Sequence, residues 1–243
     1  MLAQANRAPF VKNTVLASLS LTDRLAIGSH LEPLVLKERT VLQEPKSDPE
    51  YIYFVESGIV SQRIVEAESV LETAVIGYRG VVGAAFLVGG QIPTQQSVVV
   101  FPGKALRMRS NNLRRVMTEH PQVLERLLSY LRALNTHSAQ MALCGARHPV
   151  VQRLASWLSL TCDAYDSHVL PVTHDYLSEM LAIRRPRVTE TLIRFEEQGL
   201  IRKTRGLLQV DDRADLQREA CGCYRTISNA YGRADVGVCA HTV

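Results

Sequence analysis

Basic side chains crowd into one short stretch near the C-terminal end of the chain. Residues 184–205 hold seven lysines and arginines against three glutamates, so this stretch carries a net charge of +4, which equals that of the whole chain. The basic residues are Arg184, Arg185, Arg187, Arg194, Arg202, Lys203 and Arg205. Three of them fall at the start of a predicted helix, where the helix dipole disfavours positive charge. A polyanion such as the DNA backbone would offset this repulsion; the alternative is an ordinary solvated basic helix.

The residues around this cluster predict two short helices joined by a tight turn. Leu177, Met180 and Leu181 share one face of a first helix, which Thr173 can cap. In the second helix Pro186 lies in the first turn, where its missing N–H costs little. The inward residues of this helix are Val188, Leu192 and Phe195, and the outward ones are Pro186, Arg187, Glu190 and Arg194. A buried seam behind a polar face is typical of a DNA-binding helix-turn-helix.

This stretch resembles the helix-turn-helix of the Crp/Fnr family of bacterial transcription regulators, from Thr173 through Ile201 and into a predicted β-wing at 202–210. In that family the side chains that read base edges stand at the positions of Arg185, Pro186, Thr189 and Glu190. Here Pro186 replaces the usual glutamate and Glu190 the usual arginine. The resemblance therefore implies DNA binding but not the family's familiar operator sequences. Ala182 stands where the turn often has glycine, which predicts slight strain.

We therefore predict a set of DNA-contacting residues on the two helices and the wing. They are Thr173, Arg184, Arg185, Pro186, Arg187, Thr189, Glu190, Arg194, Arg202, Lys203 and Arg205. Arg185 and Arg187 are expected to reach base edges or phosphates, and Glu190 to accept a hydrogen bond from a cytosine amino group. Arg194 and the basic residues of the wing are expected to hold phosphates.

The N-terminal half has a different periodicity. A short helix is predicted over residues 14–31, with Ser20 and Asp23 at capping-box spacing. Short β-prone runs separated by turn residues follow it, which predicts a compact antiparallel roll. These runs are residues 35–42, 51–58, 59–65, 72–78, 97–101 and 105–109.

The order of these elements extends the resemblance from about residue 14 to about residue 231. A β-roll, a long helix and a helix-turn-helix are the layout of Crp/Fnr regulators, whose roll resembles a cyclic-nucleotide-binding domain. The predicted fold class is α+β, with an N-terminal antiparallel β-roll of jelly-roll type. We predict the sensor roll at 1–119, a dimerisation helix and hinge at 120–147, and the winged helix-turn-helix domain with a C-terminal helix and tail at 148–243.

The segment from Gly80 to Gly103 contains no charged residue. Cyclic-nucleotide binders of this kind carry a glutamate for the ribose and an arginine for the phosphate. Ala84 stands at the glutamate position, and Gln95 or Gln96 lies near the arginine position. A buried phosphate without a cationic partner is strongly disfavoured, so we expect no cyclic nucleotide here. The alternatives are an uncharged small-molecule effector, a protein contact, or a segment packed on itself. The predicted pocket residues are Gly80, Gly83, Ala84, Phe86, Gln95, Gln96 and Ser97.

A heptad-like stripe begins after His120. Its members are Leu124, Leu127, Leu131, Leu134, Ser138 and Met141, at spacings of 3, 4, 3, 4 and 3. This pattern predicts a parallel two-fold helix pairing, which would place two recognition helices about one DNA turn apart. The alternative is a helix that covers its own β-roll. We expect the helix to break near Gly145 and residues 146–148 to form the hinge. Past the wing, residues 213–231 are predicted to be helical and the last dozen residues disordered.

Five cysteines lie in the second half of the chain, at Cys144, Cys162, Cys221, Cys223 and Cys239. Their odd number argues against a disulfide framework, and the N-terminal ligand cysteines of Fnr-type iron–sulfur sensors are absent. On one helix, Cys221 and Cys223 would point about 200° apart, which predicts one packed and one exposed thiol rather than a shared ion. Cys144 and His148 share a helix face only if the helix passes Gly145. We therefore predict no metal site and no cofactor, and haem or metal sensing through His137 has no support in the sequence.

The whole chain is predicted to be a homodimeric, sequence-specific DNA-binding regulator that reads a palindromic site with the helix after Arg184. No catalytic motif stands out, so we do not expect an enzyme. The chain has neither a signal-like apolar segment at its start nor a run of 18 apolar residues, which predicts a cytoplasmic protein without a membrane partner. The resemblance adds RNA polymerase as a partner. The alternative is a small-molecule or redox sensor that acts through protein contacts and binds DNA weakly.

Overall fold

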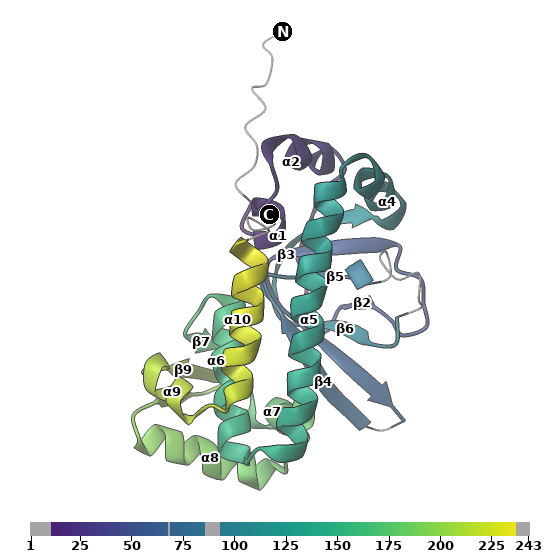
Figure 1. Cartoon of the computed structure of the whole chain (residues 1–243). Coiled ribbons are helices and arrows are strands. Elements are labelled where there is room, and N and C mark those ends of the chain that lie inside the picture. Colours follow the sequence, from purple (N-terminus) through teal and green to yellow (C-terminus); the bar gives the residue numbers. More distant parts are fainter. Residues whose placement is uncertain (1–10, 68, 86–92, 237–243) are drawn as a thin grey trace.

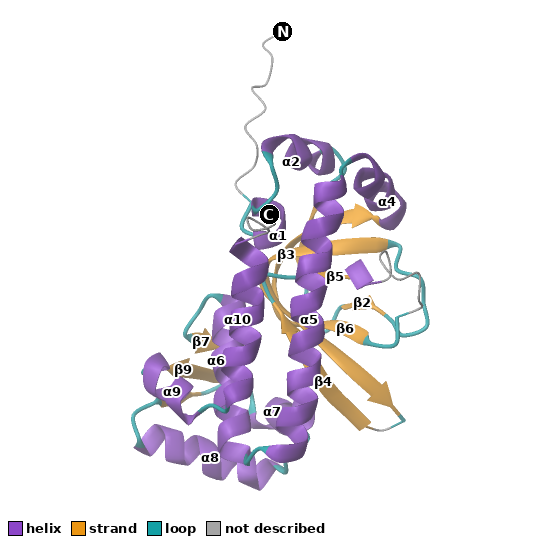
Figure 2. Cartoon of the chain, viewed as in Figure 1, coloured by secondary structure: helices purple, strands orange, loops and turns teal. Residues whose placement is uncertain are grey.

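The fold is α+β, as predicted, and it is described by a computed structural model that covers residues 11–67, 69–85 and 93–236. An antiparallel sheet with short helices forms one end of the molecule, and a helical unit with a small sheet forms the other (Figure 1). One long helix, α5, runs along both, and the C-terminal helix α10 lies beside it (Figure 2). No helix among the described residues is long and apolar enough to cross a membrane.

Six strands make the N-terminal sheet. They are β1 (Glu32–Leu36), β2 (Val41–Gln43), β3 (Tyr51–Glu66), β4 (Ser69–Ile76), β5 (Val81–Val82) and β6 (Gln96–Arg109). Their order is β1-β6-β3-β4, with β2 also paired to β6 and β5 to β3, and every pairing is antiparallel. Ile52, Phe54 and Val99 are buried on the inner face of this roll.

Several predicted strand boundaries are wrong, because turn-forming residues lie inside long bent strands. The runs at 51–58 and 59–65 form the single strand β3, and those at 97–101 and 105–109 form β6, whereas the run at 35–42 is divided between β1 and β2. The pairing of β3 with β6 shifts register between Val55 and Val60. Gly58 lies there at a φ of +86°, and a Cβ on it would lie 2.6 Å from the Phe101 carbonyl oxygen. This glycine therefore marks a bulge and not a chain reversal.

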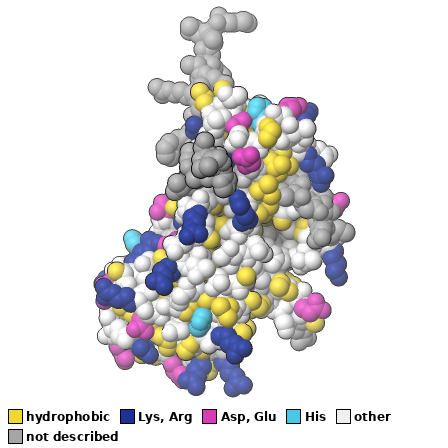
Figure 3. Space-filling view, viewed as in Figure 1, with side chains coloured by type: hydrophobic (Ala, Val, Ile, Leu, Met, Phe, Trp, Pro, Cys, Tyr) yellow, Lys and Arg dark blue, Asp and Glu magenta, His cyan; other side chains and the backbone are white. Residues whose placement is uncertain are grey.

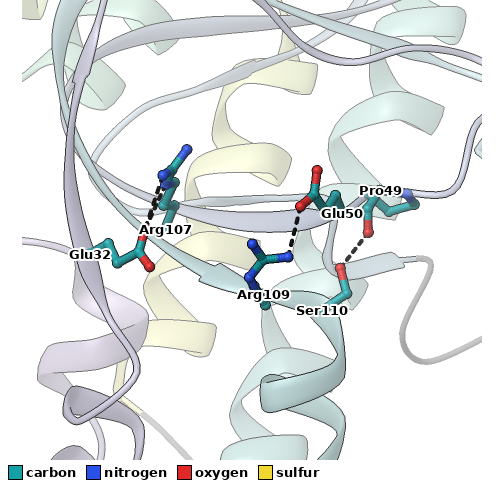
Figure 4. A network of polar contacts seen from close by, with 6 residues as sticks. All are labelled: Glu32, Pro49, Glu50, Arg107, Arg109 and Ser110. Carbon is teal, nitrogen blue, oxygen red and sulfur yellow. Dashed lines mark hydrogen bonds and ion pairs between the residues drawn. The ribbon is translucent and has the colours of Figure 1, made fainter.

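Paired charges connect β6 to the chain segments on either side of it (Figure 4). Arg107 donates to Glu32 on the neighbouring strand at 3.0 Å, and Arg109 donates to Glu50 at 2.8 Å. Both guanidinium groups lie over the ring of Tyr51, at 4.3 and 5.2 Å from its centroid. Next to these pairs, Met108 is buried and Arg109 is exposed.

The single helix predicted over 14–31 is two helices, α1 (Thr14–Ala17) and α2 (Leu21–Gly28). Ser20 separates them, because its side chain accepts a hydrogen bond from the Asp23 N–H at 3.1 Å and so begins a new helix. The predicted capping residues are thus confirmed, but they mark the middle of the segment.

The helix break predicted near Gly145 occurs two residues further on. Helix α4 (Ser110–Glu119) leads into α5 (Pro121–Arg147), which passes through Gly145 and ends at Arg147 with His148 as its C-cap. Pro149 then caps α6 (Val150–Tyr165), whose Leu154, Trp157 and Leu158 are buried. One face of α5 packs on the roll, and this face includes the buried Leu127 and Leu134.

The C-terminal part begins after α6. Its elements are β7 (Val169–Leu170), α7 (His174–Met180), α8 (Arg185–Glu197), β8 (Ile201–Thr204), β9 (Leu207–Val210), α9 (Arg213–Glu219) and α10 (Gly222–Val236). The wing predicted at 202–210 is β8 and β9, joined to β7 in one small antiparallel sheet. The helix predicted over 213–231 is divided into α9 and α10.

Helix α10 returns along α5 to the sensor roll (Figure 1). Its Asp235 accepts hydrogen bonds from Arg79 Nε and Thr14 Oγ1, each at 2.8 Å, and its Tyr231 hydroxyl lies 3.2 Å from His137 Nδ1. The predicted disorder of the last dozen residues is therefore wrong for 232–236, which are helical, while 237–243 lie outside the described residues. The C-terminal helix thus joins the helix-turn-helix end of the molecule to the β-roll.

Candidate nucleic-acid interface

Helices α7 and α8 and the turn between them follow the predicted local pattern. Thr173 caps α7, since its hydroxyl accepts a hydrogen bond from the Tyr176 N–H at 3.2 Å. The turn passes through Ala182 at a φ of +48°, the strained position expected of a residue that replaces glycine. The Ser178 hydroxyl donates to the Ile183 carbonyl at 2.6 Å and fixes the turn from the side of α7.

The predicted seam between the two helices is buried. Leu177, Met180 and Leu181 of the first helix and Val188, Leu192 and Phe195 of the second are at most 2% exposed. All but Met180 belong to one apolar cluster with Trp157 of α6 and Leu208 of the wing. This packing fixes the orientation of α8, so its outward face is presented as a rigid surface.

The predicted contact residues lie on the outer surface around α8 and the wing, where lysine and arginine side chains gather at the lower end of the molecule (Figure 3). Thr189 and Lys203 are half-buried, and the other nine are exposed. Several form exposed ion pairs: Arg185 with Asp175, Arg187 with Glu190 at 3.3 Å, Arg194 with Glu219 at 3.3 Å, Arg202 with Asp211 at 3.5 Å, and Lys203 with Glu196 at 2.8 Å. Exposed pairs of this kind contribute little stability, so these side chains can exchange their partners for phosphates at small cost.

Arg184 and Arg205 differ from the other arginines of this surface. Neither makes an ion pair with any residue that the structure describes, and both are exposed. Arg184 immediately precedes α8, and Arg205 lies with Gly206 at the tip of the wing. Their positive charge is therefore directly available to an anion.

His174 and Asp175 belong to this surface, although the sequence reasoning missed them. They line a groove of about 200 Å³ together with Thr173, Arg185 and Lys203. His174 Nδ1 lies 3.0 Å from Thr189 Oγ1, and Asp175 pairs with Arg185. Burial lowers the pKa of His174, as do the charges of Lys203 and Arg185. The only signal in the sequence is their position directly after the helix cap Thr173.

A buried carboxylate connects this helix pair to the sensor sheet. Glu72 of β4 accepts hydrogen bonds from Ser61 Oγ at 2.5 Å, Trp157 Nε1 at 2.5 Å and Tyr176 Oη at 3.0 Å. Trp157 lies in α6 and Tyr176 in α7, so these bonds cross from the roll to the DNA-binding unit. Burial raises the pKa of Glu72, although the three donors act in the opposite direction. Sequence reasoning did not single out this residue.

Several predicted effector residues meet in a cavity of about 210 Å³ inside the roll. Gly83, Ala84, Gln95 and Ser97 line it together with Leu131 and Leu134 of α5, and no lining residue in the described part of the chain carries a charge. Two other predicted members point elsewhere. Gln96 bonds to Arg63 and Glu44 at the surface, and Gly80 lines a separate cavity beside Tyr130. Phe86 lies outside the described residues.

The predicted dimer stripe is divided between the core and the edge of α5. Leu127 and Leu134 are buried in the protein's own core against the roll, which is the alternative that the sequence left open. Leu124, Leu131, Ser138 and Met141 are half-buried. The side of α5 that remains exposed instead presents Leu128 and Asn135.

The predicted arrangement of the cysteines is wrong in two respects. Cys221 precedes α10 instead of lying on it, so the angular separation expected on one helix does not apply, and both Cys221 and Cys223 are buried. Because α5 passes through Gly145, its end also brings Cys144 and His148 to the same place. Cys162 lies apart from them in α6, and Cys239 is outside the described residues.

A family model described as the Crp-like helix-turn-helix domain matches residues 152–219. Among solved structures, the chain is similar to FixK2 from Bradyrhizobium japonicum, with a TM-score of 0.68 and 14% identity over 79% of this chain and 98% of that one. It is also similar to a Crp/Fnr-family transcriptional regulator from Thermus thermophilus, with a TM-score of 0.64 and 22% identity over 78% and 98%.

A third similar structure is the c-di-GMP-responsive global regulator CLP from Xanthomonas campestris, with a TM-score of 0.65 and 16% identity over 79% of this chain and 100% of that one. No curated protein matches the sequence. The Thermus neighbour is described as a transcriptional regulator and the Xanthomonas neighbour as a global regulator of gene expression.

Proposed function

For this chain, a transcription regulator of the Crp/Fnr type with a Crp-like helix-turn-helix domain, we propose that a homodimer reads a palindromic DNA site with the N-terminal half of α8. The observation that carries this proposal is the exposed basic face of α8 and the wing on a rigid buried seam. Arg185, Arg187 and Glu190 read base edges, and Arg184, Arg194 and the basic residues of the wing hold phosphates. Thr173, Pro186 and Thr189 complete the contact surface.

The dimer forms through the exposed face of α5. Leu124, Leu128, Leu131, Asn135, Ser138 and Ala142 follow one another at spacings of 4, 3, 4, 3 and 4 and are exposed or half-buried. This stripe keeps Leu124, Leu131 and Ser138 from the sequence prediction and replaces the members that pack in the core. A buried asparagine in such a seam favours one register of two parallel helices, which suits Asn135 to the central position.

Dimerisation has a matched pair of test variants on the same helix. Leu128 and Leu143 are similarly exposed, at 37% and 46%, but Leu143 lies off the proposed stripe. Leu128→Asp is expected to give a monomer in sedimentation velocity at micromolar protein, because it places two carboxylates in the seam, and Leu143→Asp is expected to remain a dimer. Monomeric wild-type protein, or two variants that behave alike, would rule out this seam.

The effector is an uncharged small molecule in the roll cavity. This is supported by the uncharged lining and by Leu131 and Leu134, through which the cavity touches the helix proposed to form the dimer. The Xanthomonas relative is described as responding to c-di-GMP. That ligand is anionic, and the described lining of this cavity offers no cation to a phosphate, so we do not extend its ligand to this chain. We also propose that the protein is cytoplasmic and contacts RNA polymerase. Both statements rest on its similarity to Crp/Fnr transcription regulators.

Selection of bound sequences from a random DNA pool tests this function. Full-length protein is expected to enrich a two-fold symmetric site, and Arg185→Ala is expected to lose preference at one base pair in each half-site. Lys37→Ala, an exposed cation on the sensor roll, serves as the control and should enrich the wild-type site. A pool that remains random after selection with the wild-type protein would overturn the proposal.

A further inference from the structure

Four residues with metal-binding side chains meet where α5 ends and α10 begins. They are Cys144, His148, Cys221 and Cys223, and their ligand atoms all lie within 4.8 Å of one another. The first two come from the last turn of α5 and its C-cap, and the other two from the junction between α9 and α10. Two distant pieces of the chain thus supply two ligands each.

The distances within this group fit a single tetrahedral ion. Cys144 Sγ lies 3.5 Å from Cys221 Sγ, and Cys223 Sγ lies 3.6 Å from His148 Nδ1. A tetrahedral zinc site with bonds of roughly 2.3 Å to sulfur and 2.0 Å to nitrogen has edges of roughly 3.8 Å between two sulfurs and 3.6 Å between sulfur and nitrogen. A disulfide would require about 2.05 Å between the sulfurs. In a four-iron cluster each ligand binds a different iron, so the ligands would lie further apart.

The four side chains lie in surroundings that bury the thiols and supply hydrogen bonds to them. The three thiols are buried together and form a cluster of their own, separate from the two large apolar cores. The Ser156 hydroxyl of α6 lies 3.1 Å from Cys221 Sγ and accepts a hydrogen bond from the Cys221 N–H at 3.2 Å. Contacts of this kind orient the ligands of a metal site.

We propose that Cys144, His148, Cys221 and Cys223 bind one structural zinc ion through three thiolates and one imidazole. Soft thiolates with one imidazole in tetrahedral geometry favour zinc over magnesium, calcium or manganese, and four protein ligands leave no open position for a substrate. The thiol protons leave to the solvent as the ion binds, and neither the metal nor the sulfurs change oxidation state. This site is independent of the proposed DNA function.

The ion would fasten the hinge of the molecule. Cys144 and His148 bracket the last turn of α5, directly before α6 carries the chain into the helix-turn-helix. Cys221 and Cys223 stand at the start of α10, which runs back along α5 to the roll. One ion therefore closes a loop of chain that contains the entire winged helix-turn-helix and sets its position against α5.

Metal content of the full-length protein, purified without a histidine tag under reducing conditions after zinc supplementation, tests the proposal. Elemental analysis is expected to give about one zinc per chain. Cys223→Ser is expected to lose most of that zinc, and Cys162→Ser, which changes a buried cysteine outside the group, is expected to keep it. Zinc loss that is equal in the two variants would overturn the assignment.

A second measurement on the unmodified protein keeps the proposal testable if a variant fails to fold. Substitution with Co²⁺ is expected to give the thiolate-to-metal absorption of a tetrahedral site at one ion per chain, and a thiol-blocking mercurial should release the ion. Wild-type protein that binds neither zinc nor cobalt, or that contains a Cys144–Cys221 disulfide by mass spectrometry after reducing purification, would contradict the site. DNA affinity is measured separately, so failure of DNA binding leaves this result unaffected.

Discussion

The cavity in the β-roll and the outward face of α8 differ in how they use charge. The described lining of the cavity carries no ionisable side chain, whereas α8, its N-cap and the wing carry seven cations, six of them exposed, around a buried apolar seam. A surface that binds a polyanion can be recognised from the sequence, because phosphate contacts need lysine and arginine. A pocket for a neutral ligand needs only shape and a few polar groups. DNA binding is therefore much easier to infer from the sequence than the identity of an effector.

Glu72 joins the roll that holds the cavity to the helical unit that carries α8, so the largest expected effect comes from removing its carboxylate. Glu72→Ala leaves the hydroxyls of Ser61 and Tyr176 and the indole N–H of Trp157 without their acceptor. Unpaired buried donors should lower the free energy of unfolding by about 3 kcal/mol in urea denaturation. Glu179→Ala, an exposed change on α7, should cost less than about 0.5 kcal/mol. Equal losses from both variants would show that the buried carboxylate does not join the two regions.

On the charged side of the comparison, Arg185→Ala should weaken binding to the selected DNA site by about 1–3 kcal/mol and relax one base preference. Arg205→Ala, at the wing tip, should weaken binding to all sequences alike and reduce the salt dependence by about one phosphate contact. Fluorescence anisotropy at several salt concentrations measures both effects. If each variant lost the same affinity for specific as for scrambled DNA, the assignment of Arg185 to base contacts and of Arg205 to phosphate contacts would be wrong.

Along α5, acid sensitivity should come from His137, which lines a second cavity with Tyr130 and Tyr231. Burial lowers its pKa to about 3, so the folded protein keeps this imidazole neutral while the unfolded chain takes up a proton below its ordinary pKa of 6.5. The contribution of His137 to stability is therefore present above pH 6.5 and falls by about 1.4 kcal/mol per pH unit as the pH drops from there towards 3.

Unfolding free energies between pH 7 and 5 test this assignment. His137→Gln should flatten the acid limb of the pH–stability curve, whereas the exposed His168→Gln should leave its slope unchanged. An unaltered acid limb in His137→Gln would place the sensitivity elsewhere in the molecule.

The smallest effect is expected at the turn between α7 and α8. Ala182 has a φ of +48°, which glycine adopts without the Cβ contact, so Ala182→Gly should raise the free energy of unfolding by about 0.5–1 kcal/mol. Its DNA affinity should remain that of the wild type, because residue 182 is outside the proposed contact set. A loss of stability would mean that the surrounding packing, and not the left-handed backbone, decides this position.

The predictions from sequence were most accurate for features that depend on residues close together in the chain. The cap at Thr173, the strained Ala182 and the buried faces of α7 and α8 depend on residues a few positions apart, and all are confirmed. The antiparallel roll was predicted as a class, but turns were expected between 51–58 and 59–65 and between 97–101 and 105–109, although each pair of runs forms one bent strand. A bulge and a turn use the same residue types, so only the pairing partner distinguishes them.

Contacts between distant segments could not be predicted. Glu72, Trp157 and Tyr176 belong to three elements, and no periodicity connects them. The same limit explains the error at Cys144 and Cys221, which are 77 positions apart and meet only because α10 folds back along α5. Leu127 and Leu134 of the predicted stripe pack in the core, because a leucine-rich helix can turn either of two adjacent faces to the roll.

The most direct test of the account is the affinity of the full-length protein for its selected site and for a scrambled site at physiological salt. A dimer that reads bases with α8 should bind the selected site at least about 1,000-fold more tightly, with two chains per duplex. Equal affinity for the two duplexes, or one chain per site, would contradict the central claim that this chain is a dimeric reader of a specific DNA sequence.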